Sequence, residues 1–307
     1  MTLSLIPWFK LHGWPLFGSL KIEPFGILVA VGIIFGSRIA EWRAEKTGVP
    51  RAIISDFLLN VVFIGLVLCA VLNVVVYEPE KVVEMGRAIA SWFGSGERVP
   101  FPYPGLSSFG GFVGGTLTAL WFRHKRRVSL MVLGDIFCFA FPFAWVFGRM
   151  GCFVVHDHPG LPSDFFLAVD NYYGEGIARH DLGLYEVIWS ALMIPLVLWL
   201  GRKPRPWGFF MALVPLCYAP VRFGLDFLRE TSINGGDVRY LGLTPGHYAS
   251  VAMFVAGIIV AVRVARGPAA TLWLDGAPPA GEVSADAPVS GAKGKQAPAA
   301  RKKQRAR

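Results

Sequence analysis

Seven runs of apolar residues, each close to the length that crosses a lipid bilayer, constrain this chain more than any other feature of its sequence. They cover residues 24–40, 53–77, 108–122, 131–147, 182–200, 207–228 and 243–264. A helix needs about 20 predominantly apolar residues to span the hydrocarbon layer, and only structures that satisfy their own backbone hydrogen bonds are stable there. The sequence therefore predicts an all-α fold: a polytopic integral membrane bundle of seven transmembrane helices.

The third run is short and rich in glycine. Gly110, Gly111, Gly114 and Gly115 recur at helical spacing. Because small residues let a neighbouring backbone approach closely in lipid, this stripe predicts a helix in the interior of the bundle.

The composition agrees with a chain that has lipid as its solvent. Hydrophobic residues make up 54% and charged residues 17%, and the mean hydropathy is +0.49, outside the range of ordinary soluble domains. A net charge of +9 would suit nucleic acid, but the basic residues fall in short clusters between the apolar runs. We therefore expect the membrane bilayer, and no nucleic acid, as a partner. The scattered cysteines, without a CxxC pair, suggest neither a disulfide framework nor a zinc site.

The basic clusters also predict an orientation. They follow the first, third and fifth runs: Arg38, Arg43, Lys46 and Arg51; Arg123, Lys125, Arg126 and Arg127; Arg202, Lys203 and Arg205. Loops rich in Lys and Arg stay in the cytoplasm, so we expect a multi-pass protein of the cell inner membrane with a periplasmic N-terminus and a cytoplasmic C-terminus. Residues 1–266 are predicted to form the membrane domain, and residues 267–307, rich in Ala, Pro and Gly and basic at the end, a disordered cytoplasmic tail.

Two predicted outer loops, 78–107 and 152–181, are too long to be simple turns. The first contains an apolar stretch, 88–93, that predicts a short interfacial helix, and the second mixes aromatic with acidic residues. We expect these loops to form a periplasmic head or arm.

Several ionisable residues lie at or near the predicted membrane depth, where they are costly and usually functional. They are Arg149, Tyr185, Glu186, Arg222, Asp226 and Arg229. Arg222, Asp226 and Arg229 stand at i, i+4 and i+7, on one face of a helix. Arginines that converge from different helices would clamp the phosphate of a lipid head group. The same residues could instead extend to the outer head groups and neutralise one another, and the pattern alone fits a transferase or a lipid transporter.

Four segments, in the right order, resemble the prolipoprotein diacylglyceryl transferase family. The glycine-rich third span of that family is similar to SFGGFVGGTLTALWFRHKRR, and its fourth span, which ends in a GRxGNF signature, to DIFCFAFPFAWVFGRMGCF. The family's HPSQLYE and RFxxEFxRE elements are similar to HDLGLYE and RFGLDFLRE. The resemblance covers residues 24–264.

This resemblance implies a reaction in which the diacylglyceryl group of phosphatidylglycerol moves to the lipobox cysteine thiol of a preprolipoprotein, forming a thioether and releasing glycerol phosphate. It implies no metal and no other cofactor. Arg149 and Arg229, the arginines of the two signatures, would bind the head group and stabilise the charge that develops on it. The substrate-binding positions predicted in this way are Arg149, Arg222, Asp226, Arg229, Gly110, Gly111, Gly160, Tyr185 and Glu186.

The chain departs from the family pattern at three polar positions. Phe109 stands where the family has a histidine, Cys152 where it has the asparagine of the signature, and Phe25 where it usually has a tyrosine. Phenylalanine can neither accept nor donate a proton, so the usual base is missing. A non-catalytic relative that binds anionic phospholipid or lipoprotein signal regions is the alternative function.

After the signature, FVVHDHPG replaces the family's FINGExWG and introduces His156, Asp157 and His158. Either histidine could supply the missing acid or base, since histidine titrates near neutral pH; a polar loop with His158 fixed in a turn is the plain alternative. Metal ligation, or nucleophilic catalysis by Cys152, is disfavoured because further ligands are absent nearby. The predicted catalytic residues are Arg149, Arg229, His156 and Asp157.

Overall fold

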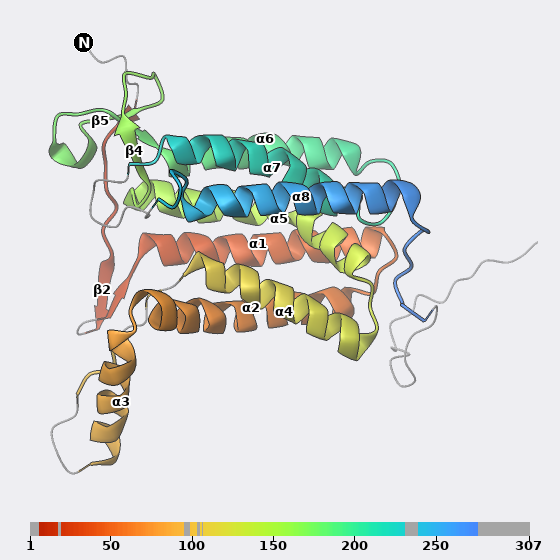
Figure 1. The fold of residues 1–307 in the computed structure, drawn as a ribbon, viewed down its shortest axis with the longest axis horizontal. Helices are drawn as coiled ribbons and strands as arrows, with labels where there is room; N and C mark the ends of the chain where they lie inside the picture. Colours follow the sequence, from red (N-terminus) through yellow and green to blue (C-terminus); the bar gives the residue numbers. More distant parts are fainter. Residues whose placement is uncertain are drawn as a thin grey trace, which may run out of the picture.

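The computed structural model describes residues 6–17, 20–94, 99–102, 105, 107–230 and 239–275, and its long helices run side by side (Figure 1). The helices are α1 Pro24–Lys46, α2 Arg51–Leu72, α3 Glu80–Phe93, α4 Ser108–Arg126, α5 Leu130–Val155, α6 Leu182–Leu200, α7 Phe209–Phe227 and α8 Pro245–Arg266, with a π-helical turn, Asn73–Tyr77, at the end of α2. The strands are β1 Ile6–Pro7, β2 Trp14–Phe17, β3 Leu20–Ile22, β4 Pro159–Pro162, β5 Val169–Asp170 and β6 Arg179–Asp181.

Six of these helices are long and apolar enough to cross a membrane: α1, α2 with its π turn, α5, α6, α7 and α8. The seventh predicted span, 108–122, does form a helix, α4, but α4 is not among the six. Its glycines lower its hydropathy, and its last turn is basic throughout, from Arg123 to Arg126. The described structure thus supports six of the seven predicted spans by length and composition.

The helix ends follow local capping chemistry. The carboxylate of Asp181 accepts a hydrogen bond from the N–H of Leu184 (3.0 Å) and starts α6, at the residue where the sequence predicts it. A capping box between Thr244 and His247 starts α8. α5 is longer than predicted and ends at Val155, because the left-handed backbone of the next residue, His156 (φ 51°), stops the helix.

Small residues bring the helices of the bundle close together. A Cβ on Gly110 would lie 2.3 Å from the carbonyl oxygen of Leu68, and one on Gly114 would lie 2.7 Å from the Cα of Gly65, both in α2. α4 and α2 therefore pack backbone to backbone, which confirms the close approach expected of the glycine stripe. α1 meets α5 in the same way, since a Cβ on Gly36 would lie 2.7 Å from that of Ala144.

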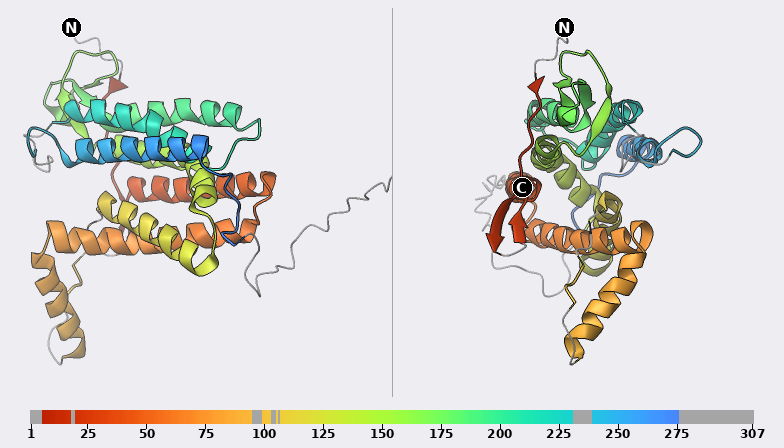
Figure 2. Two further views of the ribbon diagram at one scale, coloured as in Figure 1. Left: turned by 45° about the vertical axis from the view of Figure 1, so that its right-hand side comes forward. Right: turned by 90° about the vertical axis from the view of Figure 1, so that its left-hand side faces the viewer.

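A small four-stranded sheet, ordered β1-β5-β6-β4, forms a head at one end of the bundle (Figure 1). β1 lies parallel to β5, and β6 is antiparallel to both of its neighbours, β5 and β4. The head stands where α5 ends and α6 begins. Helix α3 leaves the bundle at this same end, at a steep angle to the long helices (Figure 2). α3 includes the stretch 88–93 for which a short helix is predicted.

The opposite end of the bundle holds the turn between α4 and α5, and the chain returns there after α8. The N–H of Ser129 donates to the carbonyl of Leu272 (2.9 Å), and the N–H of Leu274 donates to that of Arg127 (2.8 Å). We call residues 271–275 the C-terminal strap. The first residues of the predicted tail are therefore held against the bundle, and residues 276–307 lie outside the described residues.

Candidate functional site

Glu186, in the first turns of α6, is a fully buried carboxylate that draws partners from two other helices. Arg149 of α5 lies 2.9 Å away (Nε to Oε2), and Arg222 of α7 lies 3.9 Å from the other carboxylate oxygen. The hydroxyl of Tyr218 donates to Oε2, and so does the indole N–H of Trp145, at 3.3 Å. A buried charge is stable only when it is paired and hydrogen-bonded, so Glu186 needs these neighbours.

Asp226, on α7, is a second fully buried carboxylate. Arg222 lies 2.6 Å from its Oδ1 and Arg229 lies 3.4 Å from the same oxygen. Its Oδ2 accepts a hydrogen bond from the hydroxyl of Thr244 and lies 3.5 Å from Nδ1 of His247. Asp226 thus links the end of α7 to the start of α8.

Arg222 contacts both carboxylates and joins the two groups into one array. We call Arg149, Glu186, Arg222, Asp226 and Arg229 the arginine–carboxylate network. Three cations share two carboxylates, which leaves an excess of positive charge. The arginine side chains remain 12–14% exposed, whereas both carboxylates are fully buried. The part of the network that remains exposed therefore belongs to the arginines and not to the carboxylates.

His158 connects the network to the segment that follows α5. Its Nε2 lies 3.3 Å from Nη1 of Arg149, and its Nδ1 lies 2.6 Å from Oδ1 of Asp157. A guanidinium only donates hydrogen bonds, so Nε2 must accept and the proton of the neutral ring must sit on Nδ1, where it is donated to Asp157. Burial raises the pKa of Asp157, but the hydrogen bond from His158 and the nearby charge of Arg149 act against it, and the pKa lies below its usual value.

His156 has a different environment from His158, although the two are adjacent to the same aspartate. It is fully buried, its Nδ1 lies 2.7 Å from Asp181, and the rings of Trp8, Phe9 and Tyr172 pack around it. Its Nε2 has no partner among the described residues and no exposure. The structure therefore places His156 in the interior of the head, where it ties the end of α5 to the cap of α6.

Gly160 sits where a side chain would not fit. A Cβ there would lie 2.6 Å from that of His180 and 2.8 Å from the carbonyl oxygen of Leu228. Its backbone also forms an isolated bridge with that of Arg229. Gly160 thus fixes the backbone of one network arginine, which gives a physical reason for the glycine at this position.

Three other predicted binding positions, Tyr185, Gly110 and Gly111, lie outside the network. Tyr185 donates to, or accepts from, Nδ1 of His180 at 2.6 Å, and burial lowers the pKa of His180. Gly110 and Gly111 face α2, with Cys69 as the neighbour of both. Their predicted substrate-binding role stays a prediction, and close helix packing already accounts for glycine at 110.

Sequence reasoning missed several members of the site. Tyr218, Trp145, Thr244 and His247 all contact the buried carboxylates. One signal was available, because Tyr218 stands four residues before Arg222 and extends the predicted charged face by one turn. Thr244 and His247 gave no such signal, since they come from the next helix.

Cys152, Asp157 and His158 have ligand atoms that all lie within 4.8 Å of one another. Nη1 of Arg149, however, lies 3.7 Å from Sγ of Cys152 as well as 3.3 Å from the imidazole. A guanidinium between these groups opposes a second cation, so the geometry fits an anion-binding arginine better than a metal site.

The fold and the site define a class: a multi-pass membrane protein with a network of carboxylate-braced arginines beside the head. A family model described as prolipoprotein diacylglyceryl transferase matches residues 14–263. The chain belongs to the prolipoprotein diacylglyceryl transferase family.

Individual relatives agree with this assignment. A phosphatidylglycerol–prolipoprotein diacylglyceryl transferase of Chromohalobacter salexigens is 30% identical over 82% of this chain and 91% of the relative. One of Campylobacter curvus is 30% identical over 80% of this chain and 90% of the relative. One of Polynucleobacter asymbioticus is 33% identical over a shorter stretch, 52% of this chain and 61% of the relative.

Proposed function

We propose that this protein transfers the diacylglyceryl group of phosphatidylglycerol to the lipobox cysteine of a preprolipoprotein. The family, and relatives that align over most of the chain, support the activity. The observation that carries it here is the arginine–carboxylate network, in which Arg149 and Arg229 are held by buried carboxylates with part of each side chain exposed. Those two arginines are at the positions of the family signatures.

The reaction requires anion binding at the group that leaves. The substrate thiolate attacks the terminal glycerol carbon of the diacylglyceryl group, a C–S bond forms, and the C–O bond to the phosphate breaks with its electron pair going to glycerol phosphate. Negative charge grows on the phosphate oxygens as this bond breaks. Arginines already fixed in place stabilise that charge without reorganising, and Glu186 and Asp226 are the groups that fix them.

We propose His158 as the group that takes the thiol proton. A free thiol is mostly protonated at neutral pH, and its thiolate is the nucleophile. Nε2 of His158 carries a lone pair that accepts from Arg149. When Arg149 turns its N–H groups toward a phosphate, that lone pair becomes available, while Asp157 keeps the ring oriented through Nδ1. Substrate binding at Arg149 would then switch on the base beside it.

His156 has a positioning role in this proposal. Its burial leaves no route to a substrate thiol, and its hydrogen bond to Asp181 holds together the segment that carries Asp157 and His158. The predicted acid or base function thus passes to His158.

We further propose the seven-span topology, with the head and α3 on the periplasmic side of the inner membrane. Strand β1 pairs with β5, so residues 6–7 and 169–170 lie on the same side. Between them the candidate spans α1, α2 and α5 would make an odd number of crossings. If α4 also crosses, the number of crossings becomes even, as the pairing of β1 with β5 requires. The close packing of the α4 backbone on α2 supports this arrangement.

The test is direct. The full-length protein is incubated in phosphatidylglycerol liposomes with a lipobox peptide, and the diacylglyceryl mass increment on the peptide is sought by mass spectrometry. A peptide with serine in place of the lipobox cysteine is the control and should stay unmodified. Phosphatidylglycerol binding without any increment would instead favour the non-catalytic lipid-binding relative, which Phe109 and Cys152 at the family's polar positions make a specific alternative.

A further inference from the structure

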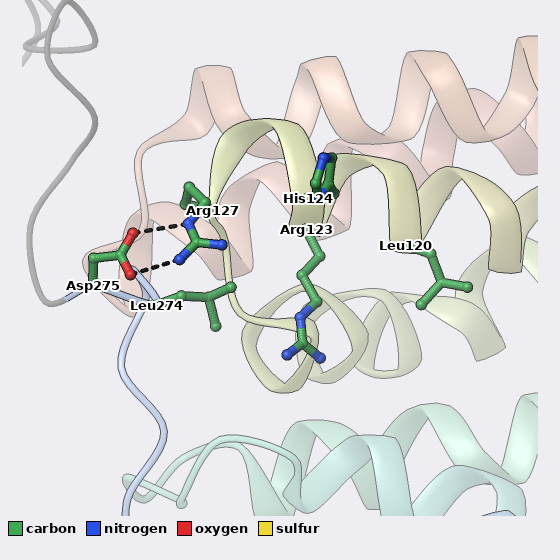
Figure 3. Close-up of a pocket in the computed structure, with 6 residues that line it drawn as sticks. All are labelled: Leu120, Arg123, His124, Arg127, Leu274 and Asp275. Atoms are coloured by element: carbon green, nitrogen blue, oxygen red, sulfur yellow. Dashed lines mark hydrogen bonds and ion pairs between the residues drawn. The ribbon is translucent and has the colours of Figure 1, made fainter.

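A basic pocket, drawn in Figure 3, lies beside the turn between α4 and α5, at the end of the bundle opposite the head (Figure 1). It has a volume of about 590 Å³ and is lined by Leu120, Arg123, His124, Arg127, Leu274 and Asp275. The volume falls within the range of small-molecule sites. Roughly 28 Å of α5, at 1.5 Å per residue, separates this end of the helix from Arg149. The pocket is therefore distinct from the arginine–carboxylate network.

The charges of the pocket favour an anion. Arg123, His124 and Arg127 are exposed, and among the residues described no carboxylate pairs with Arg123 or His124. Arg127 uses Nε and Nη2 to bind Asp275 in a bidentate pair, with both distances 2.8 Å (Figure 3). Its Nη1 takes no part in that pair. Asp275 is the sole carboxylate among the lining residues.

The pocket exists because the C-terminal strap closes one side of it. Leu274 and Asp275 belong to the strap, which the backbone bonds to Arg127 and Ser129 hold in place. The family match ends at residue 263, so this wall lies beyond the part of the chain that matches the family. The site is consequently a feature of this chain that the family assignment does not include.

Apolar groups beside the cations identify the kind of anion. The side chains of Leu120 and Leu274 are 50% and 38% exposed at the pocket, and the neighbouring Trp121 is 44% exposed. Tryptophan and basic residues together are typical of the level of lipid head groups, and pockets of this kind at helix ends bind anionic lipid heads.

We propose that this pocket binds the phosphate head group of an anionic phospholipid, in the leaflet opposite the proposed transferase site. Arg123 and Nη1 of Arg127 would contact the phosphate, and Leu120 and Leu274 would contact the first methylenes of an acyl chain. Asp275 keeps Arg127 in position, and its carboxylate repels a second negative charge on the ligand. The site therefore favours a singly charged phosphodiester over a doubly charged monoester.

The experiment compares two single-charge changes in the same basic segment. Arg123→Ala alters a lining residue, and Lys125→Ala alters an exposed residue of the same segment that does not line the pocket. The full-length protein is placed in phosphatidylcholine nanodiscs with a graded fraction of phosphatidylglycerol. Hydrogen exchange is followed at residues 127–129 and 271–275, far from the transferase site.

Phosphatidylglycerol should slow exchange in both segments of the wild-type protein and of Lys125→Ala. Arg123→Ala should need about five-fold more of the lipid for the same protection. This factor corresponds to the binding free energy that one basic residue contributes near an anionic surface. Arg123→Lys, which keeps the charge, should restore most of the affinity.

Three results would overturn the proposal. Equal shifts in Arg123→Ala and Lys125→Ala would mean a diffuse surface charge and no pocket. Equal protection by soluble glycerol phosphate, in nanodiscs of phosphatidylcholine alone, would identify a free phosphate ester as the ligand in place of a lipid. Absence of protection by either would leave the pocket without an anionic ligand.

Discussion

Arg149 of α5 and Glu186 of α6 form an ion pair, 2.9 Å from Nε to Oε2, in which the carboxylate is fully buried and the arginine side chain remains 12% exposed. The two residues come from different helices, so the pair both joins the helices and aims the arginine. The carboxylate is hidden from a ligand while the cation is presented to it. This asymmetry is what the proposed binding of a head-group phosphate by Arg149 requires.

Glu186→Gln should therefore damage both stability and activity. The amide keeps the shape of the side chain but leaves Arg149 and Arg222 with one buried anion fewer, and breaking a buried pair costs about 3–5 kcal/mol. Thermal unfolding in detergent measures the loss of stability, and the peptide assay measures the loss of activity. Asp56→Asn, which removes an exposed pair with Arg126, is the control and should change stability by less than about 1 kcal/mol. Equal losses of stability and activity in Glu186→Gln and Asp56→Asn would contradict the proposal that Glu186 holds the arginines in place.

His158→Ala should lower the turnover number by about 10²–10⁴, the usual contribution of a general base, while leaving the midpoint of thermal unfolding nearly unchanged because the side chain is partly exposed. His156→Ala should instead leave the turnover number nearly unchanged and lower the midpoint of thermal unfolding. It removes a fully buried ring and its bond to Asp181, so the protein should unfold at a lower temperature. If His156→Ala abolished turnover at unchanged stability, the assignment of the two histidines would have to be exchanged.

Gly160→Ala should reduce activity by displacing Arg229. The added methyl group would overlap His180 and the carbonyl of Leu228, and overpacking of this kind costs about 1–3 kcal/mol. Because the backbone of Gly160 pairs with that of Arg229, the strain should raise the KM for phosphatidylglycerol. Gly26→Ala provides the matched control, since a Cβ at that exposed helical position meets nothing within 4 Å. A variant at 160 with wild-type KM would argue against this role of the backbone bridge.

The stability of the head should fall in mild acid through His180. Burial lowers the pKa of His180 in the folded protein, so the unfolded chain binds a proton more readily, at its ordinary pKa of about 6.5. The stabilising contribution is therefore complete above that value and is lost as the pH falls through the lower folded-state pKa. The difference in unfolding midpoint between the wild type and His180→Gln, measured from pH 8 to pH 5, should narrow toward the acid end. A constant difference would show that protonation of His180 is not linked to folding.

Cysteine labelling tests the topology. On seven spans, single reporters at Lys125 and Glu175 should react with an impermeant maleimide from opposite sides of the membrane. Glu84, in α3, should react from the same side as Glu175. If α4 does not cross, Lys125 and Glu84 will label from one side.

The sequence predicted the long helices well and the head poorly, for physical reasons. α6 starts and ends where predicted because Asp181 caps its first turn and Glu186 is the single charged residue within its apolar run. α5 continues past its predicted end because Arg149, which looks like a break in hydropathy, is neutralised inside the bundle. Strands of two to four residues carry no periodic signal, and β1 finds its partner far along the chain.

The candidate site shows the same division. Arg222 and Asp226 could be placed on one face because they share a helix, and the structure confirms their contact. The choice between His156 and His158 could not be made, since it depends on Asp181 and Arg149, which adjacent sequence does not reveal.

The pairing of β1 with β5 has a consequence for how the protein is made. Residues 6–7 leave the ribosome early, yet their partners at 169–170 follow only after α1, α2, α4 and α5 have been synthesised. At 5–20 residues per second, the first strand waits roughly ten seconds or more with unpaired backbone groups. The head is therefore completed late in synthesis. The segment that carries His158 acquires its final support only after residues 6–7 have paired with residues 169–170.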